Sequence, residues 1–206
     1  MAEFSDPLVV MALPIESQGV FEQASVPVLY TGLGKVNAAW ALSRALSDYR
    51  HAGRALPLVL NFGTTGSRRF DTHTLVACHA FVQHDMDVTG LGFERGATPY
   101  DDSPARLEFD TVFTTLPSAV CASGDSFLTG ACALECDVVD MEAYAYAKVC
   151  WREGARFACV KYVTDGADHA AANDWQANLH HAADLFLQTY RELIAGPLPG
   201  MGAPQS

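Results

Sequence analysis

Two acidic residues, Glu142 and Asp165, are placed in the sequence where carboxylates could do chemistry. Glu142 follows the run Val138-Val139-Asp140-Met141 at the expected start of a helix, and Asp165 ends an apolar, β-branched run. Ligands of open α/β sheets bind at the carboxyl ends of strands. Two acids converging there could transfer protons or stabilise a cationic transition state. A purely structural interpretation, a first-turn helix acid and a turn residue, fits the spacing equally well.

Short apolar runs that alternate with helical patterns predict the framework that must position these acids. We expect strands over residues 8–13, 26–29, 56–62, 74–84, 119–123 and 156–163. Helices are expected over 35–49, over 144–151, and at the end of the chain. The last helix would be capped by Asn173 or Asp174 and bury one face that contains Trp175, Leu179, Ala182, Phe186, Tyr190 and Leu193. The stretch 63–66 is expected to be a turn and 91–104 a loop. The alternation predicts an α/β domain with a mainly parallel or mixed sheet.

The net charge and the lengths of the apolar runs argue against some classes of protein. The 206 residues carry a net charge of -11, which argues against binding nucleic acid because that needs a basic face. No apolar run approaches the roughly 18 residues that span a membrane, and the acidic N-terminus does not resemble a secretory signal. We expect one domain over residues 1–196 and a disordered tail over 197–206.

The six cysteines are scattered among apolar neighbours. Cys132 and Cys136 are four positions apart, but no further ligand lies nearby to complete a zinc site. We therefore expect reduced thiols in a cytoplasmic protein that needs no metal or cofactor.

Six segments of the sequence resemble the nucleoside phosphorylase superfamily and, within it, the methylthioadenosine/S-adenosylhomocysteine nucleosidases. They occur in the family's order and are Tyr30–Ala39, Asn61–Gly66, His84–Thr89, Ser123–Phe127, Val139–Ala143 and Thr164–Asp165. The resemblance implies a three-layer α/β/α sandwich with a twisted mixed central sheet. The stretches 16–32 and 99–123 are shorter than is usual in the nucleosidases, so the rim of the site is expected to differ.

The resemblance also implies a role for each acid in breaking an N-glycosidic bond. Asp165 would donate a proton to N7 of a purine, Glu142 and Met141 would hold the ribose, and Glu16 would activate the attacking water. To donate near neutral pH, an aspartate needs a raised pKa or a shared hydrogen bond.

Further residues are implied to bind the substrate, a small nucleoside. Phe127 would stack on the base, and the backbone of Leu128 would read its edge. Thr64, Thr65, Gly66 and Thr164 lie in the matching segments. Val88, Leu91 and Pro99, with Phe93, would form an apolar wall at the 5′ end of the nucleoside, near the contact of a homodimer. His84 and Asp85 are assigned to structure, and His180 and His181 to the surface.

Four functions remain open from the sequence. A hydrolase acting on a 5′-modified adenosine, of the methylthioadenosine or S-adenosylhomocysteine type, is favoured over a phosphate-dependent phosphorylase because the expected site lacks arginine. Arg68 and Arg69 follow residues 63–66 and could reach the site to bind phosphate, so the phosphorylase stays an alternative. A futalosine-type hydrolase and a non-catalytic nucleoside-binding module are the others.

Overall fold

The computed structural model of the chain describes residues 7–167, 175 and 178–196. The expected tail over 197–206 and the expected helix cap, Asn173 or Asp174, lie outside these residues. The strands are β1 (Leu8–Met11), β2 (Val28–Tyr30), β3 (Val59–Ser67), β4 (Leu75–Gln83), β5 (Arg106–Glu108), β6 (Ser118–Ser123), β7 (Val138–Asp140) and β8 (Phe157–Asp165). The helices are α1 (Pro14–Ser17), α2 (Val20–Gln23), α3 (Lys35–His51), η1 (Thr89–Leu91), α4 (Ala143–Glu153), η2 (Leu179–His181) and α6 (Ala182–Ala195).

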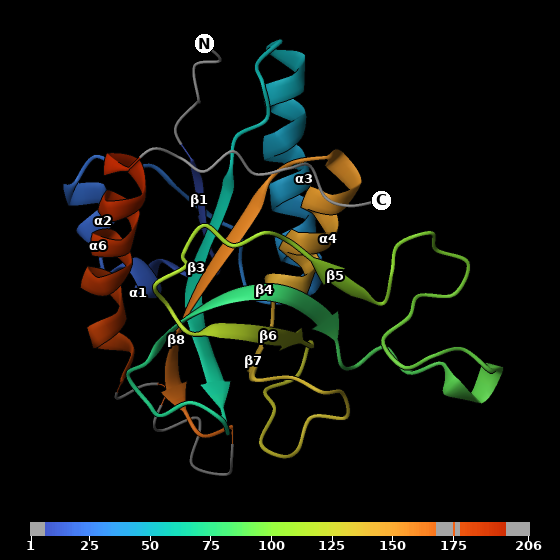
Figure 1. Cartoon of the computed structure of the whole chain (residues 1–206). Coiled ribbons are helices and arrows are strands. Elements are labelled where there is room, and N and C mark those ends of the chain that lie inside the picture. Colours follow the sequence, from blue (N-terminus) through green and yellow to red (C-terminus); the bar gives the residue numbers. More distant parts are fainter. Residues whose placement is uncertain (1–6, 168–174, 176–177, 197–206) are drawn as a thin grey trace.

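The strands form one mixed sheet that curls back on itself (Figure 1). Its order is β2-β1-β3-β7-β6-β4-β5, and β8 pairs with both β3 and β4. The pairs β1–β2, β1–β3, β3–β8, β4–β6 and β6–β7 are parallel, whereas β3–β7, β4–β5 and β4–β8 are antiparallel. The pairings among β3, β7, β6, β4 and β8 thus make a closed ring at the centre of the molecule.

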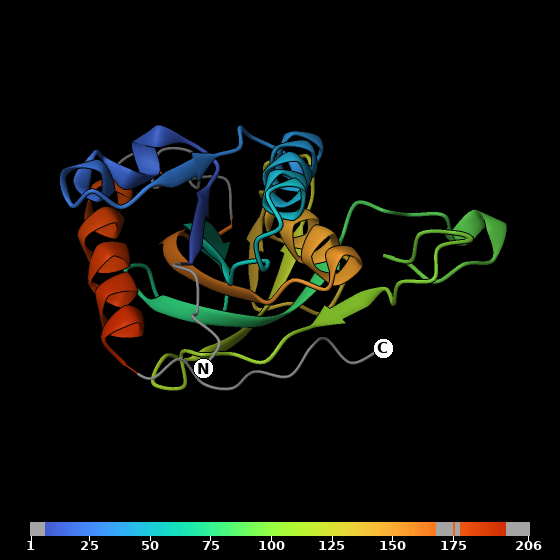
Figure 2. The ribbon, with the colours of Figure 1, turned by 90° about the horizontal axis from the view of Figure 1, so that it is seen from above.

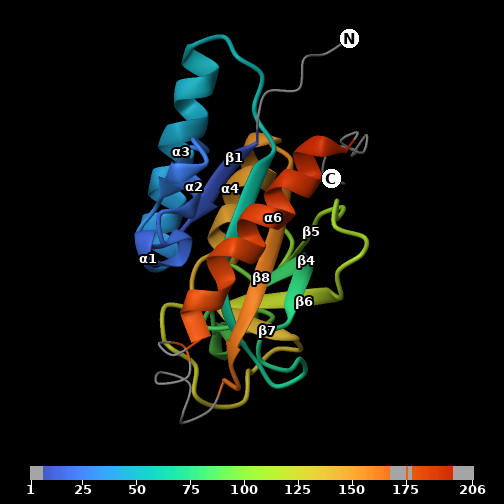
Figure 3. The same ribbon diagram turned by 90° about the vertical axis from the view of Figure 1, so that its left-hand side faces the viewer.

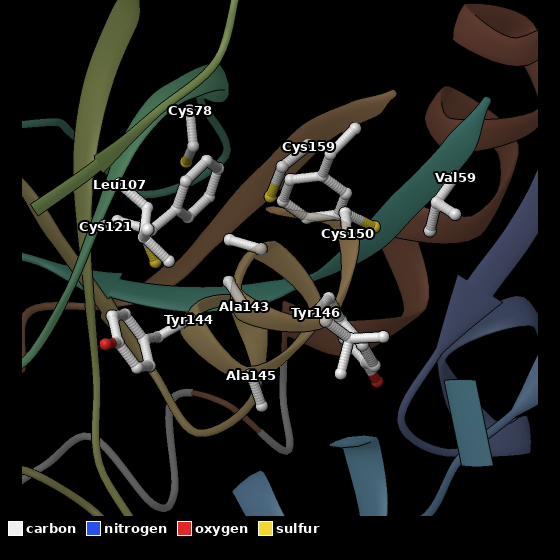
Figure 4. Packing of buried hydrophobic residues seen from close by; sticks show 14 of the residues in the cluster. Val59, Cys78, Leu107, Cys121, Ala143, Tyr144, Ala145, Tyr146, Cys150 and Cys159 are labelled. Atoms are coloured by element: carbon white, nitrogen blue, oxygen red, sulfur yellow. The ribbon is translucent and has the colours of Figure 1, made fainter. Parts of the chain in front are cut away.

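Two apolar cores, one on each face of the sheet, create the three layers. Side chains alternate along the central strands, so that Val59 belongs to one core and Leu60 to the other. The first core lies under α3 and α4 and contains Leu42, Leu46 and most of the buried face of α4. Figure 4 shows this packing, including the buried thiols of Cys78, Cys121 and Cys159.

The second core lies on the opposite face, under α6 and the two short helices α1 and α2. Phe21 of α2 and Phe186 of α6 pack against Phe62 of β3, with ring centroids 5.9 and 5.1 Å from it. Helix α6 lies over β3 and β8 (Figure 3), while α3 and α4 lie on the far side of the sheet (Figure 2). The expected three-layer α/β/α sandwich with a twisted mixed sheet is confirmed.

The structure corrects several details of the predicted elements. Residues 63–66 are not a turn but continue β3, because they pair with β8 on one side and Gly66 pairs with β7 on the other. From Leu179 on, the expected final helix is divided into η2 and α6, and Trp175 belongs to neither apolar core. Elements α1, α2, β5 and β7 were not predicted. Within the described ranges, no helix has both the length and the apolar character needed to cross a membrane.

Candidate active site

A cavity of about 430 Å³ opens where β1, β3 and β8 end, and it brings most of the predicted site residues together. Nine of the predicted residues line it, namely Glu16, Thr64, Thr65, Gly66, Phe127, Leu128, Met141, Glu142 and Asp165. Seven residues of the lining were not predicted, namely Ala12, Leu13, Leu33, Ser126, Val139, Asp140 and Trp175. Three predicted carboxylates from distant parts of the chain therefore face one space, together with Asp140.

The first carboxylate, Glu16, is held by backbone groups. It lies in α1 directly after β1 and is 5% exposed. Its Oε2 accepts hydrogen bonds from the backbone N–H of Ala12 and of Leu13, both at 3.0 Å, and its Oε1 accepts one from the N–H of Thr64 at 3.1 Å. Three oriented donors fix the position of this carboxylate. Glu16 is thus a preoriented hydrogen-bond acceptor at the wall of the cavity.

The second carboxylate, Glu142, is the N-cap residue of α4, as the sequence predicted for an acid at a helix start. Its Oε1 accepts a hydrogen bond at 2.8 Å from the N–H of Gly34, the residue before α3. Gly34 has φ 87°, a conformation that suits glycine, so its identity helps to aim this N–H at Glu142. Burial, reinforced by the nearby charge of Asp140, raises the pKa of Glu142 to about 8.

The third carboxylate, Asp165, ends β8 as expected and is 4% exposed. Its Oδ1 accepts a hydrogen bond from the N–H of Ala167 at 2.9 Å, and its Oδ2 lies 2.9 Å from the hydroxyl of Thr164. Gly66 lets the two strands approach here, because a Cβ on Gly66 would lie 2.6 Å from Oδ1 of Asp165. Asp165 is therefore locked in place at the wall of the cavity.

A buried ion pair between Lys161 and Asp140 lies next to the three acids. Nζ of Lys161 lies 2.7 Å from Oδ2 of Asp140, and each side chain is 2% exposed. The positive charge of Lys161 holds the pKa of Asp140 below its ordinary value despite burial, and Asp140 also accepts from the N–H of Ala143 at 2.9 Å. The pair fixes the turn that carries Met141 and Glu142 between β7 and α4.

Apolar side chains make up most of the remaining wall. Phe127, which follows β6, keeps 47% of its surface exposed, as an aromatic platform for a ligand would. Trp175 lines the same cavity, and its indole N–H donates to Oγ1 of Thr64 at 2.9 Å. The sequence placed Trp175 on a core face. The indole N–H of a tryptophan usually needs a hydrogen-bond partner when the ring is buried, so Trp175 could have been expected at a half-buried site instead.

Four predicted residues do not line the cavity. Thr164 is fully buried beside Asp165 and acts on it through the hydroxyl contact described above. Val88, Leu91 and Pro99 lie in the segment between β4 and β5, which reaches out from the body of the molecule (Figures 1 and 2). Leu91 is 75% exposed there.

The charges around the cavity are unevenly distributed. Among the described residues, the lining contains four acidic residues, Glu16, Asp140, Glu142 and Asp165. It contains neither lysine nor arginine. Arg68 and Arg69 line a second, neighbouring cavity instead, and Arg69 forms an ion pair with Asp137. His84 is also outside the lining. It is buried against Gly124, and its Nε2 has no hydrogen-bond partner among the described residues.

Comparison with known proteins agrees with this fold. The family model described as "Phosphorylase superfamily" matches residues 17–195. The chain belongs to the phosphorylase superfamily. A 5′-methylthioadenosine/S-adenosylhomocysteine nucleosidase of Marinomonas sp. (strain MWYL1) is 28% identical over 203 residues, which cover 86% of this chain and 84% of that protein. One of the same name from Geobacillus sp. (strain WCH70) is 28% identical over 205 residues, covering 86% and 85%.

Solved structures share the fold at lower identity. The 5′-methylthioadenosine/S-adenosylhomocysteine nucleosidase of Helicobacter pylori with butyl-thio-DADMe-Immucillin-A superposes with a TM-score of 0.78 at 20% identity, covering 92% of this chain and 99% of that one. A futalosine hydrolase mutant of Helicobacter pylori strain 26695 superposes with a TM-score of 0.77 at 22% identity, covering 90% and 98%.

Proposed function

We propose that this protein hydrolyses the N-glycosidic bond of a purine nucleoside, an adenosine modified at the 5′ position as in methylthioadenosine or S-adenosylhomocysteine. The observation that carries the proposal is the convergence of Glu16, Glu142 and Asp165 on one largely apolar cavity. A binding module would not need three buried acids around its ligand, since each costs free energy to desolvate. The names of the relatives from Marinomonas and Geobacillus support the same activity.

The three acids would divide the work of cleavage. Asp165 would protonate the leaving purine at N7, so that the base departs neutral. Glu142 would accept hydrogen bonds from the ribose hydroxyls while Met141 packs on the sugar face. Glu16, fixed by three backbone donors, would take a proton from the water that attacks the anomeric carbon. The negative groups around the cavity would also stabilise the cationic sugar of the transition state.

The distribution of positive charge supports water rather than phosphate as the nucleophile. A phosphate bound beside three carboxylates would need arginine or lysine in contact with it. The described lining offers neither, and Arg68 and Arg69 face the second cavity. The likeness to the futalosine hydrolase leaves the identity of the nucleoside to experiment.

We expect release of free base that needs no phosphate. Methylthioadenosine, S-adenosylhomocysteine, 5′-deoxyadenosine and futalosine would each be incubated with the protein, with and without inorganic phosphate, and the products separated by chromatography. Adenine and free sugar should appear from one or more adenine nucleosides at a rate that phosphate does not change. Asp165→Asn, purified in parallel, controls for contaminating enzymes. Strict dependence on phosphate with a sugar 1-phosphate product would establish the phosphorylase instead, and cleavage of futalosine alone would establish that substrate.

We also propose that the active form is a homodimer in the cytoplasm. The segment that reaches out between β4 and β5 exposes Leu91 and Tyr100, and α3 exposes Val36 and Trp40, at 64% or more of their surface. Lys35 joins the two regions by its ion pair with Asp85. A second subunit that covers these side chains could bring Val88, Leu91 and Pro99 to the 5′ end of the nucleoside, which would explain why they do not line the cavity of one chain. The six free thiols are compatible with a reducing compartment.

A further inference from the structure

A pair of cysteines lies beside the active-site cavity and has no part in the proposed chemistry. Cys132 and Cys136 belong to the long loop between β6 and β7, and both are partly exposed. Both line the second cavity, which has a volume of about 300 Å³. Their thiols lie close enough for each to shift the pKa of the other. The other four thiols, Cys78, Cys121, Cys150 and Cys159, are buried.

The two thiols differ in acidity. The hydrogen bond with Cys136 lowers the pKa of Cys132 to about 6, and the nearby His84 contributes in the same direction. The pKa of Cys136 is raised by the same contact, by burial, and by the charges around it, which include Asp137. Cys132 is therefore the more acidic thiol and Cys136 the less acidic one, the combination in which a nucleophilic sulfur has a resolving thiol beside it.

The loop connects this pair directly to the nucleoside cavity. Phe127 and Leu128, a few residues before Cys132, line the active-site cavity. Leu128, Gly66 and Val139 line both cavities, so they form a common wall. A covalent bond between Cys132 and Cys136 would shorten and stiffen the loop on one side of this wall, and the base platform at Phe127 lies on the other side.

From this arrangement we propose that Cys132 and Cys136 form a redox-modification site for hydroperoxides, whose disulfide state changes nucleoside binding in the adjoining cavity. The Cys132 thiolate attacks an oxygen of the hydroperoxide, the S–O bond forms as the O–O bond breaks, and the leaving oxygen takes a solvent proton. Cys132 is thereby oxidised to a sulfenic acid and the hydroperoxide is reduced to water or an alcohol. The sulfur of Cys136 then attacks that of Cys132, and the hydroxyl group leaves as water with the proton of Cys136. A dithiol reductant returns both thiols.

The chemical part is tested on the purified full-length protein with equimolar hydrogen peroxide. The intact mass should fall by two hydrogens, and peptide mapping should locate one bond between Cys132 and Cys136. Cys136→Ser should stop at the sulfenic acid, which dimedone traps on Cys132, while Cys132→Ser should not react. The four buried thiols serve as an internal control and should be alkylated only after unfolding. A disulfide at another pair, or unreacted Cys132 and Cys136, would refute the site.

The coupling to the cavity is tested by two measurements, of which one does not depend on activity. Deuterium exchange of the backbone at residues 126–128 should change on oxidation and return with dithiothreitol. KM for the cleaved nucleoside should change by at least about fivefold, the usual lower range for coupled sites. Cys132→Ser should keep the KM of the reduced protein and lose its response to peroxide. An oxidised protein with unchanged exchange and unchanged KM would contradict the coupling. If no nucleoside is cleaved, the proposed function fails, but the mapping and the exchange still decide this inference.

Discussion

At the scale of single residues, the geometry around Asp165 sets how a substitution should act. Its two oxygens contact the N–H of Ala167 and the hydroxyl of Thr164, and both contacts can be kept by the oxygen and amide of asparagine. Asp165→Asn should therefore fold and bind an unreactive nucleoside analogue normally. It should lose the proton transfer to the base, which typically contributes a factor of about 10² to 10⁴ in rate.

Single-turnover cleavage and binding of the analogue, measured on the same preparation, check this expectation. Near-normal turnover on adenine nucleosides would show that Asp165 is only a structural residue at the end of β8. Loss of binding together with loss of rate would instead assign it to holding the substrate.

The environment of Glu142 predicts a dependence of stability on pH. Its pKa is raised from an ordinary 4.5 to about 8, chiefly by burial. Folding therefore favours the protonated form, so the stability that this group contributes is fully present below pH 4.5 and is lost as pH rises through 8. Glu142→Gln cannot ionise and should remove this part of the pH dependence.

Thermal unfolding of Glu142→Gln and of the unmodified protein would be followed from below pH 4.5 to above pH 8. The melting temperature of Glu142→Gln should rise relative to that of the unmodified protein as the pH increases through this range. Glu108→Gln, at a site that is 66% exposed, is the matched control and should run parallel to the parent. A constant difference between Glu142→Gln and the parent would contradict the raised pKa.

At the scale of elements, strand β8 depends on one ion pair inside the molecule. Removing Lys161 leaves Asp140 charged, buried and without its cation, which typically costs about 3–5 kcal/mol. We expect Lys161→Met to lose stability of this order, as measured by denaturant unfolding. Arg106→Met removes a partner from the exposed pair with Glu108 and should cost only about 1 kcal/mol or less. Equal losses of stability in Lys161→Met and Arg106→Met would show that the buried pair contributes no more to the free energy of unfolding than the exposed one.

Elements with strong local patterns were predictable from the sequence, and those defined by distant contacts were not. The runs at β1, β3, β4, β6 and β8 are apolar because both faces of these strands are covered, so they could be recognised without the structure. Helices α1 and α2 have four residues each, and β5 and β7 have three, too few for a period to appear. The extension of β3 through Gly63 and Gly66 depends on pairing with β8, which is about a hundred positions away.

The same distinction applies to the candidate site. Glu142 and Asp165 could be placed because they lie in segments that resemble those of a known superfamily, and Glu16 because it follows the first strand where the resemblance implies a glutamate. The structure brings all three to one cavity. Leu33 and Ser126 lie inside segments that carry the resemblance but were not assigned to the lining, and Trp175 was assigned to a core face although its indole N–H offered a signal. They reach the cavity only through the packing of segments that are far apart in the sequence.

At the scale of the whole molecule, the exposed apolar side chains predict self-association. Trp40 and Val36 lie four positions apart on α3, and they are 64% and 78% exposed. Exposed apolar side chains that lie side by side are expected where a protein contacts a partner. Trp40→Asp should therefore give a monomer in sedimentation experiments, with weakened binding of nucleosides that have a bulky 5′ group. Ile194→Asp, at a site that is 48% exposed on α6, is the control and should leave the association state unchanged. A parent protein that is monomeric and fully active would contradict the dimer.

The closed ring of strands has a consequence for how the chain is made. β8 occupies the place between β3 and β4, yet it begins at Phe157, long after both of them have left the ribosome. Until then β3 and β4 each have an edge of unpaired N–H and C=O groups beside apolar side chains, the type of surface that promotes aggregation. Closure by a late strand is a pairing between residues far apart in the sequence, which makes folding slow compared with that of helical proteins. A chain that stops short of β8 should therefore be insoluble rather than partly folded. During synthesis, the open edges of β3 and β4 in the first three quarters of the chain need to be kept from aggregating until β8, in the last quarter, pairs with them.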